Sequence, residues 1–338
     1  MPAAPARADR APVSCEAARF PPVVNLRFDN DLLGAKDQDQ GYTNGVGLTL
    51  VSPNLVSYTD DPCLPRLARW LNRAFEALHP DEYAQQNMVV TVAQGLFTPV
   101  DRARTELIAD DRPYAAVLLV SLGYNARDAA RLRTTQLRLG MVGPSAQGEQ
   151  VQDQWHELIG VEKFQGWDQQ LRDEPVLQLV HERMRRWPAA GSVNAGGWGW
   201  DAIAHWGGAL GNLATYANAG AELRFGWRLP DDFGSSPLRP AGENTAPRAG
   251  VPAARRWAAH VFVTVDARGV LHDVTLDGNT FKASHHVRRE PWVADAGYGA
   301  AVTRAGWKFA FARYFRTREF AGQRHDPVFG SFTVSREF

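Results

Sequence analysis

The feature that most constrains this chain is a two-residue alternation of apolar and polar side chains that returns in segment after segment. It is clear in VVNLRFDND (23–31), in YTNGVGLTLVS (42–52) and in WKFAFARYF (307–315). Successive side chains of a β-strand point to opposite faces of the sheet. A period of two therefore predicts strands with two unlike faces.

About twelve such segments follow one another, separated by turns rich in Gly, Pro, Asp and Asn. They cover residues 23–31, 42–52, 87–99, 115–126, 135–143, 176–187, 197–211, 215–229, 256–270, 293–305, 307–320 and 329–338. The chain has 16 Phe, 11 Trp and 8 Tyr, yet its mean hydropathy is −0.34. No window reaches the roughly 18 apolar residues of a transmembrane helix. We therefore predict an all-β fold, a transmembrane antiparallel β-barrel of about twelve strands whose residues alternate between lipid and a polar lumen.

The domain organisation follows from where the alternation begins. Residues 1–22 are rich in Ala, Pro and Arg and lack an apolar core segment, so they are not an intact signal peptide. We interpret them as a flexible leader, left after a signal was removed or replaced, and residues 23–338 as one barrel. The Pro/Gly/Ser-rich segment 230–256 is predicted to be a long mobile loop. Cys15 and Cys63 are too few for a disulfide scaffold or a zinc cluster, and both a single disulfide and two free thiols remain open.

Charge and the end of the chain bear on partners and location. Lys plus Arg and Asp plus Glu both number 37, so no basic excess suggests nucleic-acid binding. The last strand carries Phe332 and Val334 on the parity of the terminal Phe338, although Arg336 interrupts this apolar set. A terminal aromatic residue that closes a final strand resembles the assembly signal of bacterial outer-membrane barrels.

Two stretches interrupt the strands with helical spacing. Residues 67–78 form one amphipathic pattern, interpreted as a lid over a strand connection. In GPSAQGEQVQDQWHELIG (143–160) a Gly-Pro turn leads into a helix predicted over 149–160. One face of this helix is expected to pack inward; it holds Val151, Trp155, Leu158 and Ile159. The opposite face holds Glu149, Gln152, Asp153, His156 and Gly160, and is either a solvated polar face or part of a site.

A second polar cluster stands where the first strand ends. FDNDLL places Asp29, Asn30 and Asp31 in succession, and their hard oxygen atoms suit a cation such as Ca²⁺. Such residues are also ordinary turn formers. In a regular strand Asn30 and Asp31 would point to opposite faces, so both side chains can ligate only if the chain bends; otherwise one contributes its backbone carbonyl or supports the other. With a histidine, this cluster would supply the general base and Lewis acid of metal-assisted ester hydrolysis.

A series of motifs in order resembles one known family, the lipid A 3-O-deacylases of the Gram-negative outer membrane. The motifs are FDND, GYTNGVGL, GLFTP, DDRPYAAVLL and LRLGMVGPSAQGEQVQDQWHELIGVEKFQGWDQQLRDEP, and they span about residues 25–175. The resemblance implies a twelve-stranded outer-membrane barrel with its active site between the wall and a helix from an external loop. It also implies a mechanism in which a histidine activates water and Ca²⁺ polarises the ester carbonyl of lipopolysaccharide.

Carried over residue by residue, the resemblance places the catalytic base at His156 and a supporting polar group at Gln152. It places the calcium site at Asn30 and Asp31, with Glu162 as a further acidic candidate. We favour Asp31 as the direct ligand, because an open site with few anionic ligands would bind Ca²⁺ weakly.

The resemblance implies further contacts with substrate and also shows departures. Thr43 would lie close to the calcium site. The family's basic residue after its TP segment has no secure counterpart, since Arg102 and Arg104 are both candidates. Arg112 is either a phosphate ligand or a structural salt-bridge residue. Ala116 stands where a glycine is expected.

Together these observations predict an outer-membrane esterase, a monomer, that removes the ester-linked acyl chain at the 3′ position of lipid A. Lipopolysaccharide and membrane lipid are the expected partners, and Ca²⁺ is the expected cofactor. One alternative is the same barrel acting on phospholipid or on the 3 rather than the 3′ acyl chain. Another is a non-catalytic barrel that binds or conducts solutes, although a pore has no use for a histidine helix beside an Asn-Asp cluster. The chain has no G-x-S-x-G elbow to supply a serine nucleophile.

Overall fold

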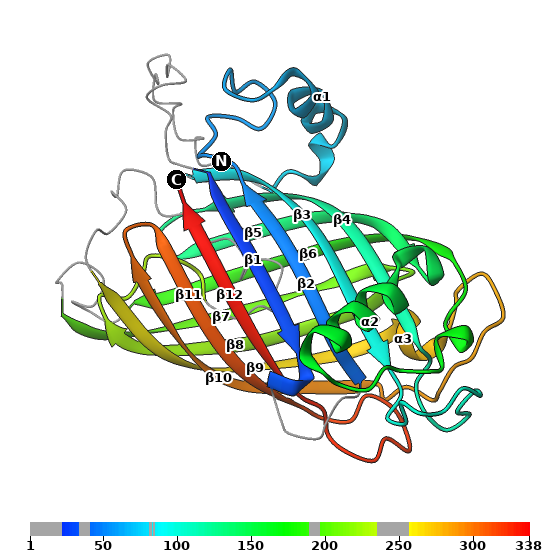
Figure 1. The fold of residues 1–338 in the computed structure, drawn as a ribbon. Coiled ribbons are helices and arrows are strands. Elements are labelled where there is room, and N and C mark those ends of the chain that lie inside the picture. The colour runs from blue at the N-terminus through cyan, green and yellow to red at the C-terminus, as the bar shows by residue number, and fades with distance from the viewer. Residues whose placement is uncertain (1–21, 34–40, 81–82, 84, 189–196, 235–256) are drawn as a thin grey trace.

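The computed structural model describes residues 22–33, 41–80, 83, 85–188, 197–234 and 257–338 (Figure 1). Twelve strands form a closed antiparallel barrel in which each strand pairs with the next and β12 pairs with β1. The strands are β1 (Val23–Asn30), β2 (Gly41–Val51), β3 (Gln85–Thr98), β4 (Ala115–Arg127), β5 (Arg131–Val142), β6 (Glu174–Pro188), β7 (Trp198–Gly211), β8 (Ala214–Trp227), β9 (Ala258–Asp273), β10 (Trp292–Arg304), β11 (Trp307–Arg316) and β12 (Val328–Glu337). This confirms the predicted fold class and strand number.

Short helices lie at both ends of the barrel. The longer ones are α1 (Arg66–Ala74) and α2 (Gly148–Ile159), with the single turn α3 (Val274–Asp277) and the short 3₁₀ turns η1 (Asp31–Leu33), η2 (Glu76–Leu78), η3 (Pro144–Ala146) and η4 (Trp167–Gln169). None of the helices in the described ranges is both long and apolar enough to cross a membrane. Figure 1 shows both chain ends and α1 at one end of the barrel and α2 and α3 at the other. We call these the terminal end and the α2 end.

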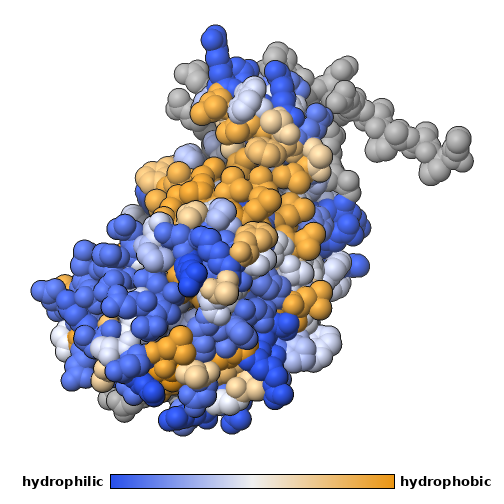
Figure 2. All heavy atoms as spheres, turned by 90° about the vertical axis from the view of Figure 1, so that its right-hand side faces the viewer, coloured by the Kyte–Doolittle hydropathy of each residue, from blue (hydrophilic) through white to orange (hydrophobic). Residues whose placement is uncertain are grey.

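Alternation along the strands divides the barrel into two unlike surfaces. Leu26, Leu48, Val92 and Val120 lie directly opposite one another on β1 to β4, and all four are exposed on the outer wall. Figure 2, which looks onto the α2 end, shows hydrophobic residues gathered in a band on the wall next to a hydrophilic region. An apolar outer belt is the surface that a membrane barrel presents to lipid.

Charged side chains fill the lumen and pair with one another. At the terminal end Asp201 accepts from Arg186 Nε at 2.8 Å and from Arg224 Nη2 at 2.6 Å. Towards the α2 end Asp295 accepts from Arg316 Nε at 2.7 Å. Ion pairs of this kind leave the buried charges compensated, which a closed interior requires.

The connection after β8 folds back into the terminal end of the lumen. Asp232 is buried there and accepts from Lys308 Nζ at 2.7 Å, and the Phe233 ring is also buried. The prediction of a mobile loop over 230–256 is therefore wrong for its first residues, because their carboxylates and ring find partners inside the barrel. Residues 235–256 lie outside the described part of the chain.

The amphipathic segment expected over 67–78 is confirmed as α1 followed by η2. With the chain around it, this segment packs on the outer wall at the terminal end, where Tyr124 of β4 is buried beside Leu55 and Tyr58. The leader and Cys15 lie outside the described residues, so the disulfide with Cys63 stays open.

Candidate active site

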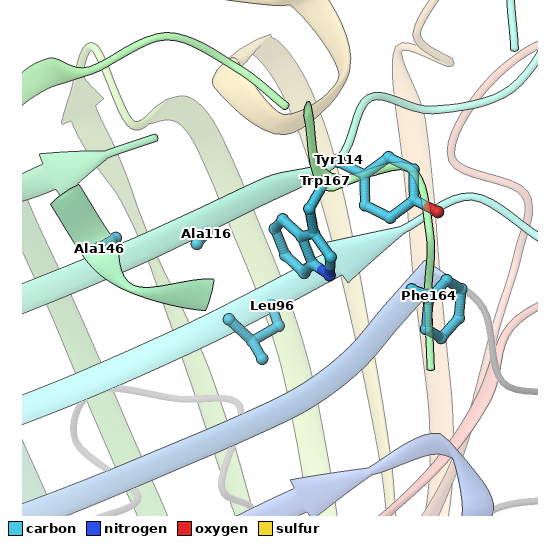
Figure 3. Close-up of a cluster of buried hydrophobic side chains, with 6 residues drawn as sticks. All are labelled: Leu96, Tyr114, Ala116, Ala146, Phe164 and Trp167. Carbon is cyan, nitrogen blue, oxygen red and sulfur yellow. The ribbon is translucent and has the colours of Figure 1, made fainter. Parts of the chain in front are cut away.

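Helix α2 lies on the outside of the barrel, against the α2 end of β3 and β4. Leu96 shares the parity of the exposed Val92, and Ala116 that of the exposed Leu118, so both point outward. They are buried nonetheless, because the chain around α2 covers them. The covering cluster is shown in Figure 3 and consists of Leu96, Tyr114, Ala116, Ala146, Phe164 and Trp167.

A glycine allows this close approach. A Cβ built at Gly148 would lie 2.4 Å from Cβ of Ala116 and 2.9 Å from Cη2 of Trp167. The contact also explains how Ala116 is accommodated where the family resemblance leads one to expect glycine. The methyl group of Ala116 on the wall occupies the space that a side chain at position 148 of the helix would need. The preceding turn is held to the wall as well, since Gln94 Nε2 donates to the Ala146 carbonyl at 2.6 Å.

The helix begins and ends within one residue of the predicted bounds. The prediction of its buried face holds for Val151, which packs against the covering cluster, and for Trp155, which packs against Phe28, but it is wrong for Leu158 and Ile159, which are exposed. Gln152 and His156 are each only 1% exposed, whereas Leu158 is 77% exposed. The physical reason is the surroundings: α2 sits beside the lipid-facing belt, where an apolar outer face costs little. Its polar side chains gain hydrogen bonds by turning towards the wall and the segment after the helix.

A backbone carbonyl orients the imidazole of His156. Nδ1 of His156 lies 2.6 Å from the carbonyl oxygen of Glu162. A carbonyl can only accept, so Nδ1 carries the hydrogen and Nε2 bears the lone pair of the neutral ring. Gly160, at φ 69°, ends the helix in the left-handed region and reverses the chain so that Glu162 returns to the histidine.

The amide of Gln152 is fixed in the same way. Its Oε1 accepts from the indole Nε1 of Trp167 at 2.9 Å, and Trp167 is itself held in the covering cluster. This contact assigns the oxygen and nitrogen of the amide. Nε2 is buried and makes no hydrogen bond with any residue in the described ranges. The arrangement presents an N–H donor one helical turn from His156.

At the end of β1 the chain bends between the two predicted calcium residues. Asn30 is the last residue of the strand and Asp31 the first of η1, and both are buried. The Leu32 N–H contacts Oδ1 of Asn30 and Oδ1 of Asp31, each at 2.9 Å. Asn30 Nδ2 donates to the Thr43 carbonyl at 3.0 Å, which ties the end of β1 to the start of β2. With this bend, the side chains of Asn30 and Asp31 can both face the same calcium site.

The third residue of this cluster belongs to the lumen instead. Asp29 accepts from the Tyr42 hydroxyl at 2.8 Å and from the Ser331 hydroxyl at 2.6 Å, and it pairs with Arg27 at 3.2 Å. Its charge is compensated inside the barrel. Asp29 therefore does not join Asn30 on the outer side.

Helix α2 and the end of β1 meet through two aromatic rings. The centroids of Phe28 and Trp155 are 4.9 Å apart. Phe28 is two residues before Asn30 on the same face of β1, a spacing of about 7 Å along a strand. Trp155 is the immediate neighbour of His156. The structure thus brings the predicted base and the predicted calcium residues to one part of the outer wall.

One residue of this region was missed by sequence reasoning. Asn44 lies directly opposite Asn30 in the register of β1 and β2, on the parity of the exposed Val46 and Leu48. It is 4% exposed. The sequence pattern could have indicated Asn44, because it is a polar residue at an outward position of a strand whose other outward residues, Val46 and Leu48, are apolar.

Thr43 and Glu162 are placed differently from each other. Thr43 is buried, and its hydroxyl lies 2.6 Å from that of Thr98. The carboxylate of Glu162 is exposed, while its backbone carbonyl holds His156. A role for the Glu162 carboxylate in metal binding stays a prediction.

The predicted arginines Arg112 and Arg104 also differ from each other. Arg112 is buried and pairs with Glu319 at 3.1 Å, and its second terminal nitrogen donates to the Thr275 hydroxyl at 2.9 Å. These contacts support the role of Arg112 as a structural salt-bridge residue, because they join three loops of the α2 end. Arg104 is exposed, and with Arg112 and Arg324 it lines a cavity of about 190 Å³.

The donor chemistry at the end of β1 fits a calcium ion. The oxygen atoms available there are the carboxylate of Asp31 and neutral amide and hydroxyl oxygens of Asn30, Asn44 and Thr43, which are hard ligands. Across the described ranges no group of three or more His, Cys, Asp or Glu side chains gathers. A calcium ion at this place would therefore rely on one carboxylate, neutral oxygens and water, and its affinity would be low.

Comparisons with known proteins bear on the fold and on the family. The solved structure of LpxR from Salmonella typhimurium superposes with a TM-score of 0.72 at 19% identity, covering 94% of this chain and 100% of that one. The β domain of the Bordetella autotransporter BrkA gives a TM-score of 0.44 at 11% identity, covering 94% and 99%. No curated protein sequence matches significantly. The sequence profile of the family described as outer membrane protein LpxR matches residues 2–338, so the chain belongs to the LpxR family of outer membrane proteins.

Proposed function

We propose that this protein is an outer-membrane esterase that hydrolyses the ester-linked acyl chain at the 3′ position of lipid A. His156 acts as the general base, and Ca²⁺ is the cofactor. Family membership supports the lipid A deacylase class. The position and chemistry of the site described above support the choice of residues.

The observation that carries the proposal is the position of the site on the outer wall, at the edge of the apolar belt. Asn30 and Asn44 face each other in one outward row, and Phe28 and Val46 face each other in the next row towards the terminal end. A lipid lying against this wall would place its acyl chains over the apolar rows. Its ester would then reach the level of Asn30 and Asn44. A soluble ester would gain nothing from such a location.

The reaction uses the lone pair of His156 Nε2. This nitrogen accepts a proton from water while the water oxygen attacks the ester carbonyl carbon, forming a new C–O bond. The tetrahedral intermediate then expels the sugar oxygen as its bond to the carbonyl carbon breaks, and the imidazolium returns the proton to that oxygen. The products are a free fatty acid and a sugar hydroxyl, and no covalent enzyme intermediate is needed.

The other residues position these atoms. The Glu162 carbonyl keeps the histidine in the productive tautomer, and it stabilises the imidazolium that forms by accepting the Nδ1 hydrogen. The Nε2 group of Gln152 is available to donate to water or to the substrate. Asp31, Asn30 and Thr43 would hold the calcium ion. When bound, calcium polarises the ester carbonyl and offsets the negative charge that develops on its oxygen.

The competing reading of a solute-conducting barrel is weaker on structural grounds. Lumen-facing charges pair across the interior, as Arg224 does with Asp201 and Lys308 with Asp232. The buried segment that contains Phe233 fills the terminal end further. The interior of a conducting porin is instead a water-filled channel.

Mass spectrometry of lipid A tests the proposal. Cells that produce the protein should yield lipid A that has lost its 3′ acyl substituent, and cells that produce His156→Asn should yield the unmodified form. Loss of the 3 acyl chain would reassign the regiospecificity. Release of fatty acid from phospholipid alone would make the protein a phospholipase, and unchanged lipids would contradict an esterase.

A further inference from the structure

Four arginines face outward on the wall of β5 and β6, far along these strands from α2. We call Arg131, Arg133, Arg183 and Arg185 the arginine cluster. Arg183 and Arg185 have the parity of Leu177 and Leu179, which are exposed apolar residues of the belt on β6. Arg131 and Arg133 have the parity of the exposed Leu139 on β5. Towards the terminal end, the outer surface of these two strands therefore changes from leucine to arginine.

The register places these like charges directly opposite one another. Arg131 faces Arg185, and Arg133 faces Arg183. Opposite residues in an antiparallel pair have Cβ atoms about 5 Å apart, and residues two apart along a strand are separated by about 7 Å. Four positive side chains thus rise from a small rectangle of the wall, an arrangement that is unfavourable without an anion.

Three of these four arginines lack, within the described part of the chain, the carboxylate partners that compensate charge in the lumen. Across the described ranges, none of Arg131, Arg183 and Arg185 forms an ion pair with an acidic side chain. The neighbouring inward residue Arg186, by contrast, pairs with Asp201 at 2.8 Å. The three outward arginines are exposed and available to an external ligand.

Aromatic side chains of the kind found at membrane interfaces frame the cluster. The Arg133 guanidinium lies 5.4 Å from the Tyr83 ring centroid, and that of Arg185 lies 5.1 Å from Trp187. Trp206 of β7 lies directly opposite Arg183. Tyr and Trp mark the level at which apolar chains give way to headgroups. The cluster is thus set at the headgroup level, on the terminal side of the belt.

We propose that the arginine cluster is a binding site for the phosphate groups of an anionic phospholipid in the leaflet around the terminal end. Guanidinium groups bind phosphate through two parallel hydrogen bonds, and the spacing within the rectangle suits a lipid with two phosphates, such as cardiolipin. The acyl chains of that lipid would lie along Leu177 and Leu179. The site is independent of the proposed esterase, which lies at the other end of the barrel.

The test measures lipid retained by the purified full-length protein after exchange into detergent with equal amounts of cardiolipin and phosphatidylethanolamine. Native mass spectrometry should show preferential retention of cardiolipin by the parent protein. Arg183→Gln with Arg185→Gln should reduce that retention about tenfold. Arg288→Gln with Arg318→Gln, two exposed arginines of the α2 end, removes the same charge elsewhere and should leave retention unchanged. Heat-modifiable migration and unchanged deacylase activity would show that each variant is folded.

A charge-conserving variant and a soluble competitor sharpen the outcome. Arg183→Lys with Arg185→Lys keeps the charge but loses the paired donors, so it should retain an intermediate amount of cardiolipin. Equal retention by the parent and the double Gln variant would overturn the proposal. So would an equal preference of the parent for the two lipids. Displacement of cardiolipin by an equimolar amount of inorganic phosphate would show a site for free anions instead of a lipid site.

Discussion

The position of one hydrogen decides whether His156 can act as a base. The carbonyl of Glu162 holds that hydrogen on Nδ1. Nothing in the residue type sets this tautomer; it depends on Gly160, which returns the chain to the helix. Replacing the imidazole, and with it the basic Nε2 atom, should therefore affect catalysis most.

Replacing the imidazole tests that assignment. His156→Asn should leave the barrel folded and lower the rate of lipid A deacylation by roughly 10²–10⁴-fold, the contribution of general-base catalysis. Rates are measured by mass spectrometry on purified protein with lipopolysaccharide. His181→Asn on the outer wall and His286→Asn in an exposed loop serve as controls and should keep nearly full activity. A similar loss in all three variants would remove the special role of α2.

Asp31 and Asn30 should respond differently to calcium. Asp31 is the acidic donor of the proposed site, whereas the Asn30 amide already ties Thr43 to β1. Asp31→Ala should abolish activity at every calcium concentration. Asn30→Ala should mainly raise the calcium concentration needed, which for an open site is about 10⁻⁴–10⁻³ M.

The measurement is deacylase activity titrated with calcium after treatment with EGTA. A direct readout is calcium binding to the purified protein by calorimetry, which does not depend on turnover. Full activity of the parent protein in excess chelator would refute the calcium mechanism. It would leave His156 to act without a metal.

At the scale of elements, the distance between α2 and the wall is set by two small residues. Gly148 provides the space that the Ala116 methyl group occupies. Replacing hydrogen by methyl in such a contact overpacks it at a cost of about 1–3 kcal/mol. The helix should shift, and the histidine with it.

A paired substitution tests this contact. Gly148→Ala should reduce activity severalfold and lower the temperature at which the barrel loses its heat-modifiable form. Adding Ala116→Gly removes the closer of the two clashes and should restore part of both properties, since the contact with Trp167 remains. Ala116→Gly alone is the matched control. If the double variant were no better than Gly148→Ala, the contact would not set the position of the helix.

At the scale of the whole molecule, closure of β1 on β12 removes every exposed strand edge from the barrel. Closed barrels resist unfolding in detergent until heated. The protein should therefore fractionate with outer membranes, and its migration on gels should change after boiling. Recovery as a soluble monomer without detergent would contradict the transmembrane assignment.

The sequence by itself determined the barrel. Alternation with a period of two is a local property of each strand, and it survives because one face always meets lipid and the other the lumen. The bend after Asn30 was one of two arrangements that the sequence left open. The helix between β5 and β6 and its His156 could also be read locally, because capping and periodicity do not depend on distant residues.

Only the tertiary structure decided what each face of α2 meets. Leu158 has the pattern of a core residue but is exposed, since the apolar environment here is outside the protein. The partner of Arg112 is Glu319, 207 residues away, and no local pattern joins them. The outward row of Asn30 and Asn44 likewise depends on the register between strands. Periodicity shows that a helix or strand has two unlike faces, but which surroundings each face meets is fixed only when the chain closes on itself.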